Sequence, residues 1–279
     1  TYTFTAGTVN YAATGAQNVQ AATYNNLTFT SVSITSTKTA LGDVNVNGIL
    51  TIGDVNTTLA MGNNTLTLVG NYVHTSGAPQ ISYGANGTFI HTGAAWNIQN
   101  TITTFNNLTL SGSGNKTLNT NLTVNGNLVV NSGVTFIQGT NTITGTASKS
   151  FTLNSGATHT NAVTASVAIP ASFGTYSFAS TSTYRLNGIA AQTISSVPQY
   201  GNLDISTSGG NATLNGNTTV QGNLLMNGGT PTLADGGFSL TVNGSTVNLR
   251  NYVATTGTTL TLGGCLLYTS PSPRDRTRS

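Results

Sequence analysis

Short runs of alternating apolar and polar residues fill this chain, and turns rich in Asn, Gly and Ser separate them. Residues 66–68 read Leu-Thr-Leu, and residues 122–124 and 240–242 both read Leu-Thr-Val. An alternation of period 2 places the apolar side chains on one face of a β-strand and the threonines on the other. The pattern therefore predicts very short strands with a buried face and a threonine-rich outer face, and an all-β fold.

The same phrases recur in the same order along the chain. An aromatic anchor with an Asn-Leu phrase, and then a corner glycine, occur at Tyr24 and Gly48, Phe105 and Gly126, and Tyr200 and Gly222. A third phrase, Leu-Thr or Ile-Thr, follows each glycine after 17 or 18 residues. These intervals define a long repeat of roughly 80 to 95 residues, built from steps of about 20, with units starting near residues 15, 93 and 188.

A step of about 20 residues suits one turn of a β-helix, in which each circuit returns the chain above itself. Asn and Gly suit the corners because they tolerate left-handed backbone conformations, and stacked Asn amides can bond from turn to turn. One turn alone buries too little apolar surface to offset its ordering entropy, so stability has to come from stacking. We predict a right-handed parallel β-helix, or β-solenoid, over residues 1–264, as a fragment open at both ends.

One interval breaks this spacing. The segment between the second and third units is 19 residues longer than its counterpart between the first and second, which is about one additional turn. The Leu-Thr pattern is replaced near residues 163–184 by Pro170, Phe173, Tyr176, Phe178 and Tyr184. Two interpretations remain open: an inserted turn with a bulkier core, which we favour, or a loop that leaves the rod and presents aromatic side chains to a ligand.

The composition changes abruptly after Gly264. Residues 265–275 read Cys-Leu-Leu-Tyr-Thr-Ser-Pro-Ser-Pro-Arg-Asp and resemble an in-frame translation of a transposase adapter used in preparing DNA sequencing libraries. We therefore predict that residues 265–279 are a non-native, unstructured tail that plays no part in the fold. The alternative is a natural disordered tail rich in Pro and Arg.

Without that tail the chain is nearly neutral and free of cysteine. Only 5% of the 279 residues are charged and none is Glu; the tail holds three of the eight basic residues, one of the five acidic residues and the sole cysteine, Cys265. The remainder gives no support for nucleic-acid or anionic-membrane binding. No apolar run approaches the roughly 18 residues of a membrane span. A cysteine-free surface of Thr, Asn, Ser and Gly is typical of exported β-solenoids.

The acidic residues before the tail are Asp43, Asp54, Asp204 and Asp235. A glycoside-cleaving pair or a calcium site would need several of them on one face. Comparison of the internal copies places Asp204 at the outward position of Thr109, and Asp43 at the corner position of Asn121. We therefore expect Asp204 and Asp43 to be solvated surface or turn residues, and Asp235 to begin a turn with the two glycines that follow it.

His74, His91 and His159 are the candidate metal ligands. About one turn separates His74 from His91, so stacking would bring that pair together. A later copy of the His74 segment carries Ala254 at the histidine position, so the repeat does not depend on this histidine. We predict no metal site.

Trp96 is the only tryptophan and a candidate for stacking on a sugar ring. The other copies place Gln17 and Gln192 there, two residues before an apolar position in each copy. Equal parity means the same face, so we expect Trp96 to pack in the core. No Gly-x-Ser-x-Gly, His-Glu-x-x-His or nucleotide-binding motif occurs. We predict no catalytic residue and no cofactor, and any ligand-binding residues are not defined by the sequence.

The recurring phrases Tyr/Phe-Asn-Asn-Leu-Thr, Leu-Thr-Val-Asn-Gly-Asn-Leu and Asn-Thr-Leu-Thr-Leu begin, among other places, at Tyr24, Leu122 and Asn64. Over residues 1–264 they resemble the β-strand-repeat regions of very large bacterial surface proteins. The likeness is to those exported by the type IX route in gliding bacteria, and more loosely to filamentous-haemagglutinin and autotransporter passengers. The sorting domain that such proteins often carry is not found in this sequence, so the export route follows from the resemblance alone.

That resemblance implies a non-enzymatic structural or adhesive rod, secreted or on the outer cell surface. Its expected partners are glycans or other surface components, and neighbouring repeats of the same longer chain. Two other functions remain open. A β-helix polysaccharide lyase or hydrolase would need Asp, Lys and Arg clustered on one face. Ice binding would use the outward threonine rows, and thermal hysteresis of the purified protein would separate it from a plain rod.

Overall fold

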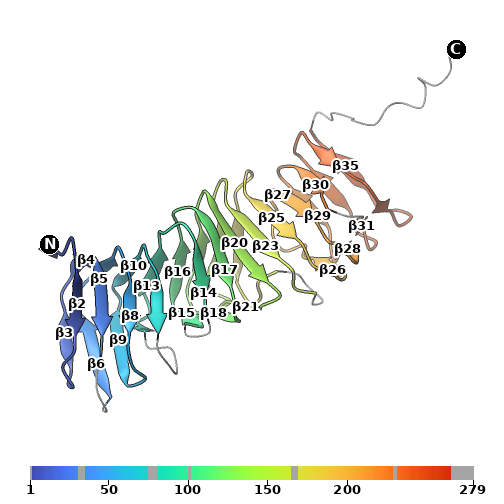
Figure 1. Ribbon diagram of the computed structural model, residues 1–279. Coiled ribbons are helices and arrows are strands. Elements are labelled where there is room, and N and C mark those ends of the chain that lie inside the picture. The colour runs from blue at the N-terminus through green and yellow to red at the C-terminus, as the bar shows by residue number, and fades with distance from the viewer. Residues whose placement is uncertain are drawn as a thin grey trace.

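The chain folds into an elongated rod in the computed structural model, which describes residues 2–30, 35–74, 81–99, 102–164, 169–228 and 231–264. Within these ranges every regular element is a β-strand. The strands stack in parallel as a β-solenoid of about 12 turns, spaced roughly 21 residues apart along the sequence (Figure 1). The all-β solenoid predicted from the alternation is confirmed. The tail predicted at residues 265–279 lies outside the described residues.

Within the described ranges the strands form seven sheets, here lettered A to G. Sheet A contains β1 (Tyr2–Thr3), β4 (Ala22–Tyr24), β7 (Val44–Val46), β10 (Thr65–Leu68), β13 (Thr88–His91), β16 (Asn107–Leu110), β19 (Leu128–Val130), β22 (Ser150–Leu153) and β24 (Thr175–Phe178). Sheet B contains β2 (Thr8–Tyr11), β5 (Asn26–Phe29), β8 (Leu50–Ile52) and β11 (Tyr72–His74). Sheet C contains β3 (Gln17–Val19), β6 (Ser36–Ala40), β9 (Thr57–Gly62) and β12 (Ile81–Tyr83).

The remaining sheets belong to the middle and C-terminal turns. Sheet D contains β14 (Trp96–Ile98), β17 (Gly114–Leu118), β20 (Val134–Gly139), β23 (Thr158–Asn161), β25 (Thr183–Leu186), β27 (Asn202–Ile205), β30 (Leu224–Met226) and β33 (Val247–Asn248). Sheet E contains β15 (Thr104–Phe105), β18 (Leu122–Val124) and β21 (Ile143–Thr144). Sheet F contains β26 (Gln192–Ile194), β28 (Asn211–Leu214), β31 (Thr232–Ala234) and β34 (Tyr252–Val253), and sheet G contains β29 (Thr218–Val220), β32 (Leu240–Val242) and β35 (Leu260–Leu262).

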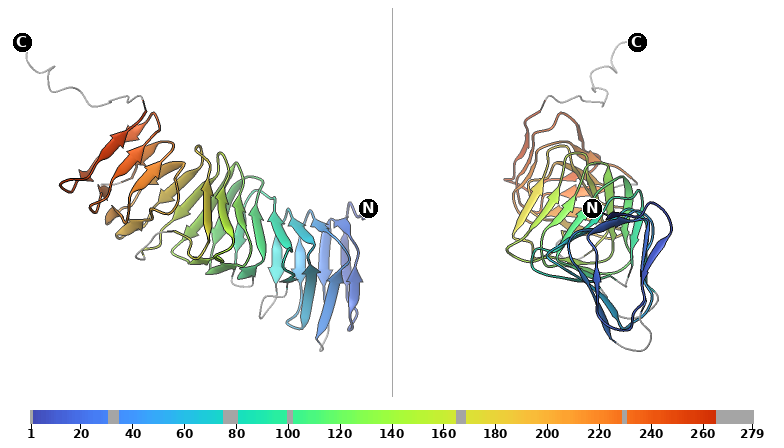
Figure 2. Two further views of the ribbon diagram at one scale, coloured as in Figure 1. Left: turned by 180° about the vertical axis from the view of Figure 1, so that it is seen from behind. Right: turned by 90° about the vertical axis from the view of Figure 1, so that its left-hand side faces the viewer.

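Consecutive strands lie on different sides of the rod, and each pairs with a strand one turn away. In the first turns the chain passes through sheets A, B and C in order, so β4, β5 and β6 pair with β7, β8 and β9 of the next turn. Seen from the N-terminal end, these turns enclose a three-sided outline (Figure 2). The backbone groups of one turn are therefore satisfied by its neighbours along the rod.

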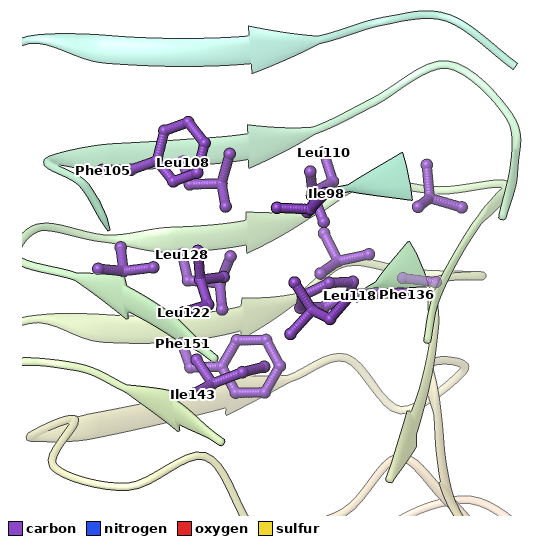
Figure 3. Packing of buried hydrophobic residues seen from close by; sticks show 14 of the residues in the cluster. Ile98, Phe105, Leu108, Leu110, Leu118, Leu122, Leu128, Phe136, Ile143 and Phe151 are labelled. Carbon is purple, nitrogen blue, oxygen red and sulfur yellow. The ribbon is translucent and has the colours of Figure 1, made fainter. Parts of the chain in front are cut away.

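Alternate side chains point inward and form rows along the interior. In sheet A, Leu66 pairs with Phe89, Phe89 with Leu108, and Leu108 with Leu128. All four side chains are completely buried. Side chains from successive turns and from different sheets meet in the middle of the rod (Figure 3). Each buried leucine contributes roughly 1.5–3 kcal/mol relative to an exposed one, so the stacked rows are the main apolar stabilisation.

The sheets change at two places, which we call the first junction (described residues of 71–106) and the second junction (described residues of 159–200). At the first junction sheets B and C end with β11 and β12, sheets D and E begin with β14 and β15, and sheet A continues. At the second junction sheet A ends with β24, sheet F begins with β26, and sheet D continues. Each junction is therefore bridged by one continuous sheet.

In all three copies of the repeat, an asparagine side chain accepts a hydrogen bond from the residue that follows a glycine one turn further along the rod. We call this hydrogen bond, with the close approach of the glycine, the clip. In the second copy, Asn107 Oδ1 accepts the N–H of Asn127 at 2.9 Å. Gly126, the residue before this donor, lies so close that a Cβ there would clash with Asn107 Oδ1. The equivalent hydrogen bonds run from Ile49 N to Asn26 Oδ1 and from Asn223 N to Asn202 Oδ1. Gly48 and Gly222 make the same close approach to these asparagines. The clip explains why the two sequence phrases recur together.

We predict that Gly126→Ala destabilises the rod more than Asn107→Ala. Loss of the amide removes one hydrogen bond, worth about 1 kcal/mol. A Cβ at residue 126 forces the Asn107 side chain and the Asn106 carbonyl away, at a cost of roughly 1–3 kcal/mol. The midpoint of guanidinium unfolding, followed by circular dichroism, measures both. Gly15→Ala is the control because its Cβ meets nothing within 4 Å; a Gly126→Ala midpoint no lower than this control contradicts the role of the clip.

Candidate functional site

The side of the rod is hollowed at the first junction. A hollow of about 420 Å³ lies between β11 and β14, lined by residues 71–73 on one side and by residues 95–97 and Gln99 on the other. A second hollow, of about 270 Å³, is lined by residues 81–85 around β12 and by residues 104–106 and Asn125 near β15. Both hollows coincide with the places where one sheet gives way to another, so the change of sheets opens the surface there.

Aromatic side chains pack behind these hollows. The rings of His91 and Trp96 stack with centroids 4.7 Å apart and planes at 5°. Phe89 stacks on Trp96 at 5.2 Å, and Phe105 packs against both. Large rings fill the interior where its outline changes between sheets. Trp96 is 5% exposed, so the prediction that it packs in the core is confirmed.

A lysine is buried directly above this aromatic cluster, one turn towards the C-terminus. Lys116 pairs in register with Trp96 and has no exposed surface. Its Nζ donates to the carbonyl oxygens of Gly93 and Ala94, at the corner between β13 and β14. The lysine thus provides a hydrogen-bond donor for two carbonyl groups that lie at the corner, outside the strands.

Lys38 does the same in the first copy of the repeat. It is also fully buried, and its Nζ donates to the carbonyls of Ala13 at 2.6 Å and Gly15 at 3.0 Å, and to Gln17 Oε1 at 2.8 Å. Sequence reasoning did not identify either lysine as buried. The signal was present, because both lysines stand two residues before an apolar core position and so share its parity.

Burial shifts these groups towards their neutral forms. It lowers the pKa of Lys116 from 10.5 to about 8. It also lowers the pKa of His91 from 6.5 to about 4; the positive charge of Lys116 adds to this shift, and the contact of His91 Nε2 with the Gly70 carbonyl opposes it. For Lys38, burial lowers the pKa and the Asp54 carboxylate works in the opposite direction. The interior of the rod therefore disfavours charge even where it accommodates a titratable side chain.

Four described residues of the first junction carry buried polar atoms without a hydrogen-bond partner. These atoms are the hydroxyls of Tyr72 and Tyr83, both ring nitrogens of His74 and Nδ1 of His91. Burial raises the pKa of both tyrosines, so their hydroxyls stay protonated. Each unsatisfied group costs about 1–3 kcal/mol. The first junction is therefore less stabilised by hydrogen bonds than a regular turn.

The acidic side chains are used as hydrogen-bond acceptors within the fold. Asp43 Oδ1 accepts the N–H of Thr65 at 2.7 Å, as Asn121 Oδ1 accepts that of Thr142 at 2.8 Å. The predicted corner role of Asp43 is confirmed. Asp54 accepts Asn56 N and Thr57 Oγ1, and Asp235 accepts Gly237 N, Thr255 N and Thr258 Oγ1. These bonds hold the pKa of Asp235 well below its usual range.

Asp204 faces outward as predicted, but the prediction that it is solvated is wrong. The residue is 1% exposed. Its Oδ2 accepts Arg185 Nε at 2.8 Å, and its Oδ1 accepts Ser206 Oγ and Asn227 Nδ2. Arg185 and Asp204 are register neighbours on β25 and β27, so the longer side chain lies against the carboxylate. The position of Asp204 in the repeat makes its side chain point outward, and residues of the two neighbouring turns cover it.

The histidine pair considered from the sequence does not form. His74 lies on β11 of sheet B and His91 on β13 of sheet A, so the two belong to different sides of the rod. His159 packs among aromatic rings with its Nε2 3.0 Å from Gln138 Oε1, and burial lowers its pKa to about 3. In the described part of the chain, no three His, Cys, Asp or Glu side chains lie together as a metal site would require.

The aromatic segment near residues 163–184 is part of the rod. β24 pairs with β22 and β25 pairs with β23, which places this segment on the stack. Phe173 and Tyr184 are buried, and the Tyr176 hydroxyl donates to the Pro170 carbonyl at 2.6 Å. The described part of the segment confirms the inserted turn with a bulkier core. The predicted segment also includes residues 165–168, which lie outside the described residues.

The two histidines with lowered pKa values predict a loss of stability in acid. Between pH 6.5 and about 4.5 the unfolded chain takes up protons at residues 91 and 159 while the folded chain does not, so the free energy of unfolding falls by up to about 1.4 kcal/mol per pH unit for each histidine. The double variant His91→Phe and His159→Phe should flatten this dependence. Urea unfolding across the window measures it, and an unchanged slope in the variant would contradict the buried, neutral state of both rings.

Lys116 predicts a dependence of the same sign at higher pH. Its folded pKa of about 8 lies below 10.5, so the unfolded chain binds more protons between these values, and stability rises with pH from about 8 to 10. We expect Lys116→Met to remove up to about 1.4 kcal/mol per pH unit from this slope. Lys149→Met, at a partly exposed lysine, is the matched control. Equal slopes in the two variants would show that Lys116 is not the source.

Comparisons of the chain with protein-family models, with curated proteins and with solved structures found no match. In the part of the chain that the structure describes, no helix is long and apolar enough to cross a membrane. The function is therefore argued from the geometry of the rod and from the repeated phrases of its sequence.

Proposed function

We propose that this chain is a non-enzymatic structural or adhesive rod of a secreted or cell-surface bacterial protein. The observation that carries this proposal is the uniform way in which the turns stack. Neighbouring turns are joined by the same parallel pairing from β1 to β35, so the length of the rod follows from the number of turns. A fold of this kind spaces or displays other parts of a protein at a defined distance.

The use of the ionisable side chains supports a structural role. Asp43 and Asp235 bind backbone N–H groups of the next turn, and the buried lysines bind carbonyls of the turn below. A polysaccharide lyase or hydrolase would instead need carboxylates directed at a substrate. Asp204 is covered by Arg185, which favours the rod over the enzyme.

The proposed location is the extracellular space or the outer cell surface. Support comes from the recurring Asn-Leu-Thr phrases, from the low charge content of 5%, and from the absence of cysteine before residue 265. The proposed partners are neighbouring repeats of a longer chain, stacked on the ends of the rod, and glycans or other surface components along its sides. Binding of nucleic acid and insertion into a membrane are not part of the proposal.

The number of turns should set the length of the rod. Residues 108–127 are one turn, because Leu108 pairs with Leu128. We predict that three extra copies of this turn, inserted after Asn127, give a folded rod longer by about 14 Å, since stacked strands are about 4.8 Å apart. Small-angle X-ray scattering measures the maximum dimension. The control is a Gly-Ser linker of equal length at the same place, and a rod that fails to lengthen beyond this control contradicts the spacer proposal.

A further inference from the structure

The outer face of sheet A is the longest regular surface of the rod. Its nine described strands pair in parallel without a shift of register. The first row of outward side chains is Thr3, Thr23, Asn45, Thr67, Ile90, Thr109, Val129, Thr152 and Ser177. The second row lies two residues further along the chain, directly after the last residue of six of these strands, where backbone bonds between turns continue: Asn47, Val69, Thr92, Ser111, Asn131 and Asn154. The face is thus a two-row array of small side chains.

The chemistry of this array is uniform. Neither row contains a charged or aromatic side chain. In the first row, all but Asn45 and Ser177 are β-branched, and β-branched side chains are stiff about χ1. Neighbouring strands are about 4.8 Å apart, and the two rows are separated by two residues of strand, about 7 Å. The face therefore presents methyl and hydroxyl groups at fixed and repeated positions.

The other faces of the described rod lack this combination. The outward row of sheet D contains the Arg185–Asp204 ion pair, and its register shifts between Ile137 and Gly139. Sheets B, C, E, F and G have three or four described strands each. Threonines occur on all sides, but among the described strands sheet A alone arranges such residues in a long, uncharged array without a register shift.

We propose that the outer face of sheet A binds ice. Stiff methyl groups at regular spacing order the water that lies between them, and the hydroxyls and amides hydrogen-bond to it. The spacing of the turns is close to the oxygen spacing along the a axis of hexagonal ice, so the ordered water can join the crystal. A glycan surface would instead favour aromatic platforms, which this face does not have. The inference names the surface to which the proposed rod adheres, and for its biological role it rests on that proposed function.

The test compares two threonines of the same turn on different faces. Thr109 lies on β16 in the first row of sheet A, and Thr117 lies on β17 of sheet D; both point outward and are partly exposed. We expect the full chain to show thermal hysteresis and to shape growing ice crystals. Thr109→Lys should lose most of the thermal hysteresis because its long charged side chain interrupts the array, whereas Thr117→Lys should keep it. Circular dichroism melting curves establish that both variants are folded.

A second pair protects the test against a variant that fails to fold. Thr67→Lys on β10 repeats the change on sheet A, and Thr51→Lys on β8 repeats it on sheet B. Absence of thermal hysteresis in the folded wild-type chain overturns the proposal, and so does an equal loss in the sheet A variants and their controls. Rod length in solution is measured separately, so a rod that lengthens with added turns and ignores ice leaves the spacer function standing and removes this inference alone.

Discussion

The structure depends on the parallel backbone pairing between neighbouring turns. A single turn closes no hydrogen-bond ladder and leaves the upper and lower sides of its apolar residues open. Once turns stack, Leu66, Phe89, Leu108 and Leu128 cover one another along the interior, and the strands that carry them satisfy each other's amides and carbonyls. The stability of each turn therefore comes from contacts with the turns next to it. Because turns add one on another in a single direction, the result is a rod.

The strands end at the corners, and polar side chains bind backbone groups there. Asn107 and its equivalents bind the N–H that follows the corner glycine of the next turn. Lys38 and Lys116 bind corner carbonyls of the turn below, and both are fully buried. A buried lysine is unfavourable unless its hydrogen bonds are made, so each lysine depends on the corner that it satisfies.

At the two junctions some sheets end and others begin, and the packing of the interior changes there. The interior there is filled by aromatic rings, with Trp96, His91 and Phe89 at the first junction and Phe173 and Tyr184 at the second. The first junction also contains the unsatisfied hydroxyls of Tyr72 and Tyr83 and the two hollows. One continuous sheet crosses each junction, and across the first it is sheet A, whose outer face stays regular while the sheets beside it change.

The sequence alone determined the strands, the face that each side chain takes and the stacking of turns. These follow from an alternation of period 2 and a repeat of about 20 residues, and both patterns can be read from the sequence without knowing the fold. It placed Trp96 in the core and Asp43 at a corner for the same reason. Only the tertiary structure decided which sheet each strand joins, and so separated His74 from His91 and brought Arg185 over Asp204. Those outcomes depend on which residues of adjacent turns meet, and this register is set by the length of each corner as well as by the alternating pattern.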